Sequence, residues 1–228
     1  MREIVMDTET TGLDPDGGDR IVEIGGVELL NHLPTGRTYH QYINPKCAMP
    51  HEAFQVHGLG DEFLRDKPVF AEIADAFLAF IGDAKLVIHN ASFDMGFLNM
   101  ELQRIGKPAL PKDRALDTLM IARKKFPGAQ ASLDALCKRF GVDNGNRTLH
   151  GALLDSEILA EVYLELLGGR QQGLILDSEV KAEEADGAAL TWVPPSRPRA
   201  LSPRLTEAER AAHEAFIAEL GDAALWKA

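Results

Sequence analysis

The first part of the chain alternates between short apolar runs and polar turns, a pattern typical of strands that follow one another. Apolar or alternating segments cover about residues 3–7, 20–30 and 37–44, and LPTG at 33–36 indicates the turn between the last two. Loops this short predict an antiparallel meander of three strands. The next stretch, 49–63, is expected to consist mostly of loops.

From residue 70 onward the apolar spacing becomes that of helices with short strands between them. A helix over 70–81 places Ile73, Phe77 and Ile81 on one face. Two short strands are expected at KLVIHN and RALDT, and further helices at about residues 92–105, 118–125, 132–140 and 151–167. This order predicts an α/β fold with a mixed sheet and helices on its faces.

The composition changes after a pair of glycines at 168–169. Residues 170–204 hold few large apolar side chains and several prolines, which predicts a flexible linker. Residues 206–220 regain helical spacing, and Thr206 and Glu209 have the spacing of a capping box. Because an isolated helix of this length is marginal in water, we expect it to pack against the domain or another protein. The expected parts are a domain over 1–169, a linker over 170–204 and a C-terminal segment over 205–228.

Charge and composition narrow the classes of function. The formal net charge of the 228-residue chain is −11, from 24 Lys and Arg against 35 Asp and Glu. This balance argues against a protein that binds nucleic acid through a broad basic face. It is compatible with acidic sites that hold cations, or with a protein that a partner delivers to its substrate. Cys47 and Cys137 form no CxxC, so neither a disulfide framework nor a zinc site is indicated. With no signal pattern and no long apolar run, the expected location is the cytoplasm.

Two carboxylates follow the first apolar run, in VMDTETTG. Asp7 and Glu9 are two positions apart, so in a strand they point to the same face. Like charges side by side repel each other and resist burial. Two explanations are open at this point: the strand ends in solvent, or the pair binds a cation.

Further acids occur at the starts of two predicted helices. In HNASFDMGFL, Asp94 lies in a first turn, where the helix dipole favours an acid, but it is surrounded by large apolar residues. In HGALLDSEILAEVY, His150 precedes Asp155 by five residues. The two side chains converge only if His150 lies in a non-helical segment and folds back, which Gly151 makes easy. Each motif alone also fits a solvated helix start.

Considered together, the four acids have the character of a divalent-cation site. Mg²⁺ takes oxygen ligands, usually a few carboxylates together with water and phosphate. Two such ions can clamp an in-line phosphoryl displacement, and they would remove the repulsion between Asp7 and Glu9. Since an imidazole ordinarily titrates near neutrality, His150 is the candidate general base for an attacking water.

The segments DTETTG, HNASFDMGFL and HGALLD, in this order and spacing, resemble the three motifs of the DEDDh 3′→5′ exonucleases. The resemblance covers about residues 1–168, and the His-x4-Asp spacing resembles that of the histidine subclass. It implies an RNase H-like fold with a five-stranded mixed sheet, here followed by a flexible C-terminal tail. It also implies two divalent cations, Mg²⁺ or Mn²⁺, bound directly by Asp7, Glu9 and Asp155 and supported by Asp94, with His150 as the base.

The resemblance extends to a pocket for the 3′-terminal nucleotide. The segment VHGL resembles a family segment that lines this pocket, through His57. It implies that Thr8, Glu9 and Phe93 lie beside the nucleotide and that Leu13 lies near the terminal base.

A basic run, ARKKFPG, follows the predicted strand RALDT. Its Arg123, Lys124 and Lys125 either contact phosphates or form a solvated helix face.

The tail carries two further resemblances. QQGLIL at 171–176 resembles the short peptide that binds bacterial sliding clamps, with Gln171, Leu174 and Leu176 at its defining positions; a chance match in a linker is the alternative. The final GDAALWKA, with Leu225 and Trp226, resembles the C-terminus of the epsilon subunits of bacterial DNA polymerase III, a proofreading branch of this family. There the tail binds the polymerase (alpha) subunit.

These resemblances predict a metal-dependent 3′→5′ exonuclease that removes mispaired nucleotides from DNA 3′ ends as 5′-monophosphates. A DEDDh ribonuclease that trims RNA 3′ ends is the near alternative, and a non-catalytic subunit that stabilises a polymerase assembly is the alternative outside enzymes. The complete set of four acids with His150 argues against the latter. Tethering to clamp and polymerase would offset the unfavourable net charge by raising the effective concentration of the DNA end.

Overall fold

The computed structural model describes residues 1–145, 149–169 and 205–221. The chain divides into two units, Met1–Leu176 and Asp177–Ala228, which are treated separately. The predicted clamp-binding residues Gln171, Leu174 and Leu176 and the terminal Leu225-Trp226 pair lie outside the described residues. No helix in the described part of the chain is long and apolar enough to cross a membrane.

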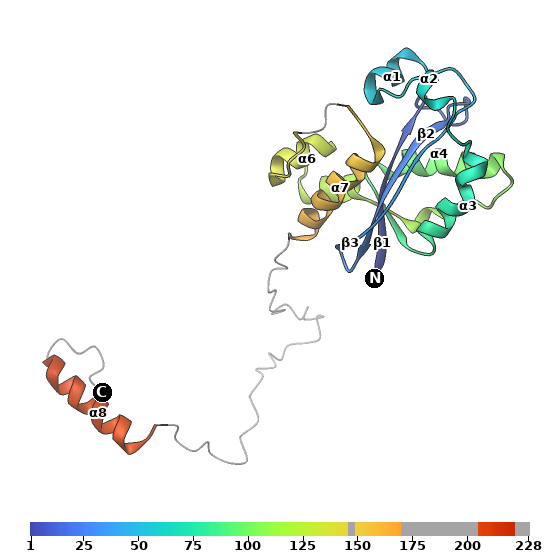
Figure 1. Ribbon diagram of the computed structural model, residues 1–228. Coiled ribbons are helices and arrows are strands. Elements are labelled where there is room, and N and C mark those ends of the chain that lie inside the picture. The colour runs from blue at the N-terminus through green and yellow to red at the C-terminus, as the bar shows by residue number, and fades with distance from the viewer. Residues whose placement is uncertain (146–148, 170–204, 222–228) are drawn as a thin grey trace, which may run out of the picture. The chain divides into compact units, whose positions relative to one another are not determined.

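A five-stranded mixed sheet forms the centre of the first unit (Figure 1). Its strand order is β3-β2-β1-β4-β5. The strands are β1 (Arg2–Thr10), β2 (Ile21–Leu30), β3 (Leu33–Tyr42), β4 (Lys85–Ile88) and β5 (Ala115–Asp117). β2 is antiparallel to β1 and β3, whereas β4 is parallel to β1 and β5. The predicted meander and mixed sheet are therefore confirmed, and the carboxyl ends of β1, β4 and β5 meet at one edge.

Helices cover both faces of this sheet, as Figure 1 shows. α3 (Phe70–Ile81) and α4 (Ala91–Arg104) pack on one face, against Ile4 and Met6 of β1. α7 (Ala152–Leu167) packs on the other, against Val5, with α5 (Thr118–Lys125) and α6 (Leu133–Phe140) beside it. Since side chains alternate along a strand, Thr8 faces the α4 side and Asp7 and Glu9 face the α7 side.

Two local predictions were wrong. The turn between β2 and β3 is made by Asn31 and His32, which both have positive φ, whereas 33–36 belongs to β3. The turn-like sequence there marks a shift of register between β2 and β3, with φ +84° at Gly36. The predicted loop over 49–63 contains two helices, α1 (His51–His57) and α2 (Asp61–Leu64), which are too short to show a clear hydrophobic period.

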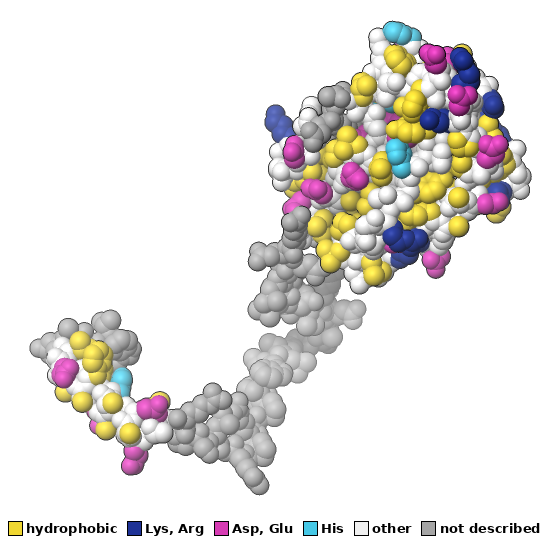
Figure 2. Space-filling model, viewed as in Figure 1, with side chains coloured by type: hydrophobic (Ala, Val, Ile, Leu, Met, Phe, Trp, Pro, Cys, Tyr) yellow, Lys and Arg dark blue, Asp and Glu magenta, His cyan; other side chains and the backbone are white. Residues whose placement is uncertain are grey.

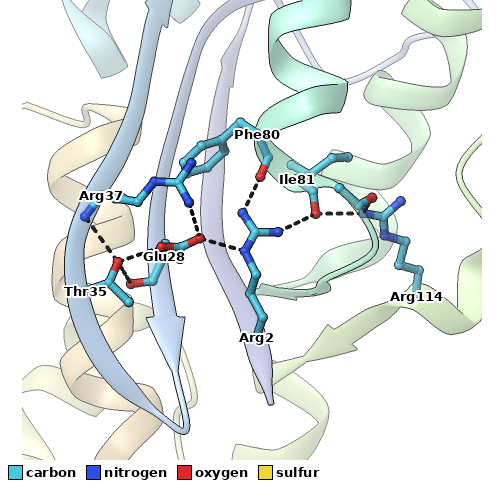
Figure 3. Close-up of polar contacts among 8 residues, drawn as sticks. Arg2, Glu28, Thr35, Arg37, Phe80, Ile81 and Arg114 are labelled. Atoms are coloured by element: carbon cyan, nitrogen blue, oxygen red, sulfur yellow. Dashed lines mark hydrogen bonds and ion pairs between the residues drawn. The ribbon is translucent and has the colours of Figure 1, made fainter.

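An arginine cluster fixes the start of β1, at the end of the strand away from Asp7 and Glu9 (Figure 3). Arg2 pairs with Glu28 of β2 at 2.6 Å, and Arg2 and Arg114 each donate to the carbonyl of Ile81 at 3.1 Å. That carbonyl ends α3, where cations also interact favourably with the helix dipole. A hydrogen bond from Thr35 and the pairing with Arg2 lower the pKa of Glu28. The cluster therefore ties the start of β1 to β2 and to the end of α3.

The surface of the first unit mixes side chains of all kinds on the face seen in Figure 2. Lys and Arg occur there singly or in small groups, and hydrophobic side chains lie between them. The unit's exposed large apolar residues include Leu30, Leu33, Phe54 and Phe63. This face offers no broad basic surface, in keeping with the net charge of −11.

Candidate active site

Asp7 and Glu9 lie at the carboxyl end of β1, on the face that α7 covers. Asp7 is half-buried and Glu9 is buried. Gly25 of β2 pairs with Asp7, and a Cβ atom on Gly25 would lie 2.1 Å from the backbone carbon of Ala152. Because Gly25 has no side chain, the start of α7 can lie directly against these strands. Gly25 was not predicted as a site residue, although a glycine inside an apolar strand is a signal for such a close approach.

Asp94 comes from the first turn of α4, which follows β4 after the left-handed residue Asn90. Asp94 is 2% exposed, and the hydroxyl of Thr8 donates to its Oδ1 at 2.7 Å. Burial raises the pKa of Asp94 to about 7, against the opposing effect of the bond from Thr8. A solvated first-turn acid, the alternative that the sequence left open, is thereby ruled out.

His150 lies in the segment before α7 and folds back toward Asp155. Gly151 caps the helix in an extended conformation, and His150 Nδ1 lies 3.4 Å from Asp155 Oδ2. The condition for convergence that the sequence set is therefore met, since His150 lies outside the helix and its ring contacts Asp155. Asp155 is 3% exposed, whereas the His150 side chain is 48% exposed, so the imidazole is open to solvent while its Nδ1 faces the buried carboxylate.

One cleft brings these residues together. It has a volume of about 550 Å³, and its lining includes Asp7, Glu9, Asp94, His150 and Asp155. One potential ligand atom from each of Glu9, His150 and Asp155 lies within 4.8 Å of the others, so these three could hold a metal ion. The carboxylates of Asp7, Glu9, Asp94 and Asp155 offer the oxygen donors that Mg²⁺ and Mn²⁺ prefer, and a cation there would offset their repulsion.

A second pocket of about 550 Å³ adjoins the cleft and shares Thr8, Glu9 and Phe93 with it. Leu13, from the loop after β1, and His57, from α1, also line this pocket. Leu13 is 84% exposed, whereas His57 is buried. The structure thus brings the predicted substrate-binding residues together around one pocket beside the acids.

His57 is buried in the wall of the second pocket. Burial is the main cause that lowers its pKa, and the charge of His150 acts in the same direction. Its Nδ1 accepts a hydrogen bond from the backbone N–H of Leu59 at 3.1 Å, so the proton of the neutral ring is on Nε2.

The three cations at the end of α5 lie in three different settings. Lys125 donates to the carbonyl of Leu166 at 2.9 Å, at the end of α7. Lys124 is exposed, as a solvated helix face predicts. Arg123 is exposed as well, but it lines the cleft that contains the acids. Which of the three faces the site was not predicted, because a helix's orientation on the sheet is not visible in its own sequence.

His89 also lines the cleft, but its contacts are structural. Its Nδ1 lies 2.9 Å from the hydroxyl of Thr118, and burial lowers its pKa.

Comparison with known proteins identifies the family. Residues 4–163 match the exonuclease family RNase_T. DNA polymerase III subunit epsilon of Rickettsia prowazekii is 49% identical over 221 residues, which cover 95% of this chain and 96% of that protein. The epsilon subunit of Escherichia coli K12 is 44% identical over 239 aligned residues, which cover 100% of this chain and 98% of that protein.

Solved structures of exonucleases share the fold of this chain. Exonuclease X in complex with 5′ overhanging duplex DNA is 27% identical, with a TM-score of 0.56 over 72% of this chain and 90% of that chain. The nuclease domain of 3′hExo, a DEDDh family member, shares the fold with a TM-score of 0.64 at 20% identity, over 73% of this chain and 91% of that chain. The chain therefore belongs to the 3′→5′ exonuclease family and, within it, to the DNA polymerase III epsilon subunits.

Proposed function

We propose that this chain proofreads for a replicative DNA polymerase III by removing mispaired 3′-terminal nucleotides from DNA as nucleoside 5′-monophosphates. The observation that carries the proposal is the convergence of Asp7, Glu9, Asp94, His150 and Asp155 on one cleft. Similarity to epsilon subunits over nearly the whole chain supports the DNA substrate.

Two divalent cations, Mg²⁺ or Mn²⁺, complete the proposed site. Asp7, Glu9 and Asp155 would hold them directly, and Asp94 would support the second ion. These residues fit such ions. The carboxylates of Glu9, Asp94 and Asp155 are buried, and without a cation their negative charges would be desolvated at a cost in free energy. When bound, such ions polarise the phosphoryl oxygens and stabilise the attacking and leaving oxygens.

His150 is the proposed general base. Its ring is partly open to solvent and its Nδ1 lies 3.4 Å from Asp155. The carboxylate orients the imidazole and stabilises the imidazolium that forms when the ring accepts a proton from the attacking water.

The 3′-terminal nucleotide is proposed to occupy the adjoining pocket. Phe93 offers an aromatic surface to the sugar and base, and the exposed side chain of Leu13 lies at the same pocket for contact with the base. Thr8, Glu9 and His57 complete the polar lining. A pocket for one unpaired nucleotide favours mismatches, because a mispaired end separates from its template at lower cost.

Partners are proposed to deliver the DNA. The segment 171–176, through Gln171, Leu174 and Leu176, would bind the sliding clamp, and 205–228 would bind the alpha subunit of the polymerase. In the second unit, α8 (Glu207–Leu220) begins with a Thr206–Glu209 capping box, and its Phe216 is 54% exposed, which provides apolar surface for a partner. With a net charge of −11, the chain benefits from such tethering.

Digestion of matched single-stranded DNA and RNA oligonucleotides with Mn²⁺ tests the activity. We expect DNA to be shortened from its 3′ end with release of 5′-monophosphates, and Asp7→Ala to lose at least about a thousandfold in rate with its fold intact. Preferential digestion of RNA would support a ribonuclease instead. Undiminished cleavage by Asp7→Ala would overturn the site.

Separate variants test the partners. Gln171→Ala with Leu174→Ala should weaken clamp binding without changing cleavage of a free oligonucleotide. Deletion of 200–228 should abolish co-purification with the alpha subunit while nuclease activity persists. Retention of either partner by the corresponding variant would contradict that assignment.

A further inference from the structure

Arg123 stands out in the acidic cleft. It is the sole Arg or Lys that lines the cleft among the residues described, whereas five Asp or Glu line it. Its side chain forms no ion pair within the described part of the chain. Asp134 lines the same cleft but has other partners, and its Oδ1 accepts a hydrogen bond from Asn144 at 3.1 Å. The charge of Arg123 reaches His89, whose pKa it helps to lower. A guanidinium placed among carboxylates without being paired to one is suited to an anionic ligand.

The position of Arg123 indicates which part of a substrate it would meet. The cleft and the nucleotide pocket share Thr8, Glu9 and Phe93, which lie between them. The nucleotide pocket continues from there to α1 and the loop after β1, whereas the cleft continues to α5 and the start of α6. A strand with its terminal nucleoside in the pocket and its scissile phosphate at the acids must therefore continue along α5.

We propose that Arg123 binds the phosphate on the 5′ side of the scissile one, the second phosphodiester from the 3′ end. The inference rests on the proposed exonuclease function and adds a subsite to it. A guanidinium can donate two parallel hydrogen bonds to a phosphate, which a solvated lysine on the same helix does not offer. Arg123 thereby holds the strand that remains after each cleavage.

The test compares two substrates with the full-length chain and Mn²⁺. The p-nitrophenyl ester of thymidine 5′-monophosphate has one phosphate, whereas a single-stranded oligothymidylate has the second. For Arg123→Ala we expect KM on the oligothymidylate to rise about tenfold, with kcat changed less than about twofold. The slope of log(kcat/KM) against log[salt] should become shallower by about 0.7, one phosphate contact. The loss should be confined to the oligothymidylate.

Two variants serve as controls. Arg123→Lys keeps the charge and should recover part of the affinity and the full salt slope. Lys124→Ala removes a neighbouring exposed cation that does not line the cleft, and its kinetics should match the wild type.

Three outcomes would contradict an assignment. An equal loss on both substrates would place Arg123 at the scissile phosphate and overturn the inference. An oligothymidylate KM and salt slope unchanged in Arg123→Ala would show a solvated side chain and overturn it as well. If the wild-type chain cut neither substrate, the proposed function itself would be overturned.

Discussion

The backbone N–H of His150 donates to the carbonyl oxygen of Val56 at 3.1 Å. Val56 belongs to α1, and it lines the proposed nucleotide pocket together with His57. The neighbouring Leu149 also packs closely against Gly58, at the end of α1. A Cβ atom on Gly58 would lie only 2.7 Å from Cδ1 of Leu149. The helix that would contact the terminal nucleotide therefore also holds the segment that carries the proposed base.

Gly58→Ala should disturb that link. Gly58 has φ +73°, so alanine there costs about 1 kcal/mol of stability from backbone strain, and its Cβ would also displace Leu149 and the neighbouring His150. We expect kcat on single-stranded DNA to fall about tenfold with little change in KM.

Gly141→Ala is the matched control for this strain. Gly141 also ends a helix in the left-handed conformation, with φ +70°, but its Cβ would meet no atom within 4 Å. Both variants should lose similar stability in urea unfolding, and only Gly58→Ala should lose kcat. Equal kcat in the two variants would show that α1 does not position His150.

Gly25→Ala tests the close approach of α7 to the acids. Its Cβ would lie 2.1 Å from Ala152, so the start of α7 must move, and Asp155 with it. We expect a loss of about 3 kcal/mol in the free energy of unfolding and a large loss of exonuclease rate. Gly26→Ala, one position along β2, would meet side-chain atoms of Ile4 and Phe80 at 3.4 Å and the carbonyl oxygen of Val5 at 3.7 Å, which are tolerable contacts, and it should keep both stability and activity. A Gly25→Ala chain as active as Gly26→Ala would contradict this role.

The motifs could be predicted from the sequence because the chemistry requires carboxylates at fixed places on recognisable elements. Asp7 and Glu9 come at the end of an apolar strand, His150 lies just before a long helix and Asp155 lies in its first turn, so both pairs could be placed before the fold was known. The long strands β1 and β2 and the long helices were predictable because their apolar patterns extend over many residues.

The features that could not be predicted depend on how helices and strands pack against one another, or belong to helices that are very short. α1 and α2 have only 7 and 4 residues, too few for a period to emerge. The orientation of Arg123 follows from how α5 lies against the sheet, and the role of Gly25 follows from the path of α7 across β2. Neither relationship is local in the sequence.

The raised pKa of Asp94 predicts a stability that depends on pH. Its folded-state value of about 7 lies above its ordinary value of 3.8, so the folded state binds this proton more tightly than the unfolded state. The stabilisation is complete below about pH 4 and is lost as the pH rises through about 7. Without divalent cations, the free energy of unfolding should fall by on the order of 2 kcal/mol between pH 5 and 8 from this group.

Asp94→Asn provides the comparison. The amide oxygen can still accept the hydrogen bond from Thr8, but the side chain no longer titrates. In urea unfolding with EDTA, the pH dependence of the variant should be flatter than that of the wild type, and the variant should be the more stable at pH 8. An unaltered pH dependence in Asp94→Asn would mean that burial of this carboxylate is not what couples stability to pH. Asp16→Asn, at an exposed turn, should behave as the wild type does.

The proposed function requires Asp7, Glu9, Asp94 and Asp155 together to bind two divalent cations. Anomalous diffraction from crystals of the chain grown with Mn²⁺ and thymidine 5′-monophosphate tests it most directly. Two manganese peaks about 4 Å apart, both within contact of these four carboxylates, are the predicted result. Manganese found elsewhere, or none between these carboxylates, would contradict it.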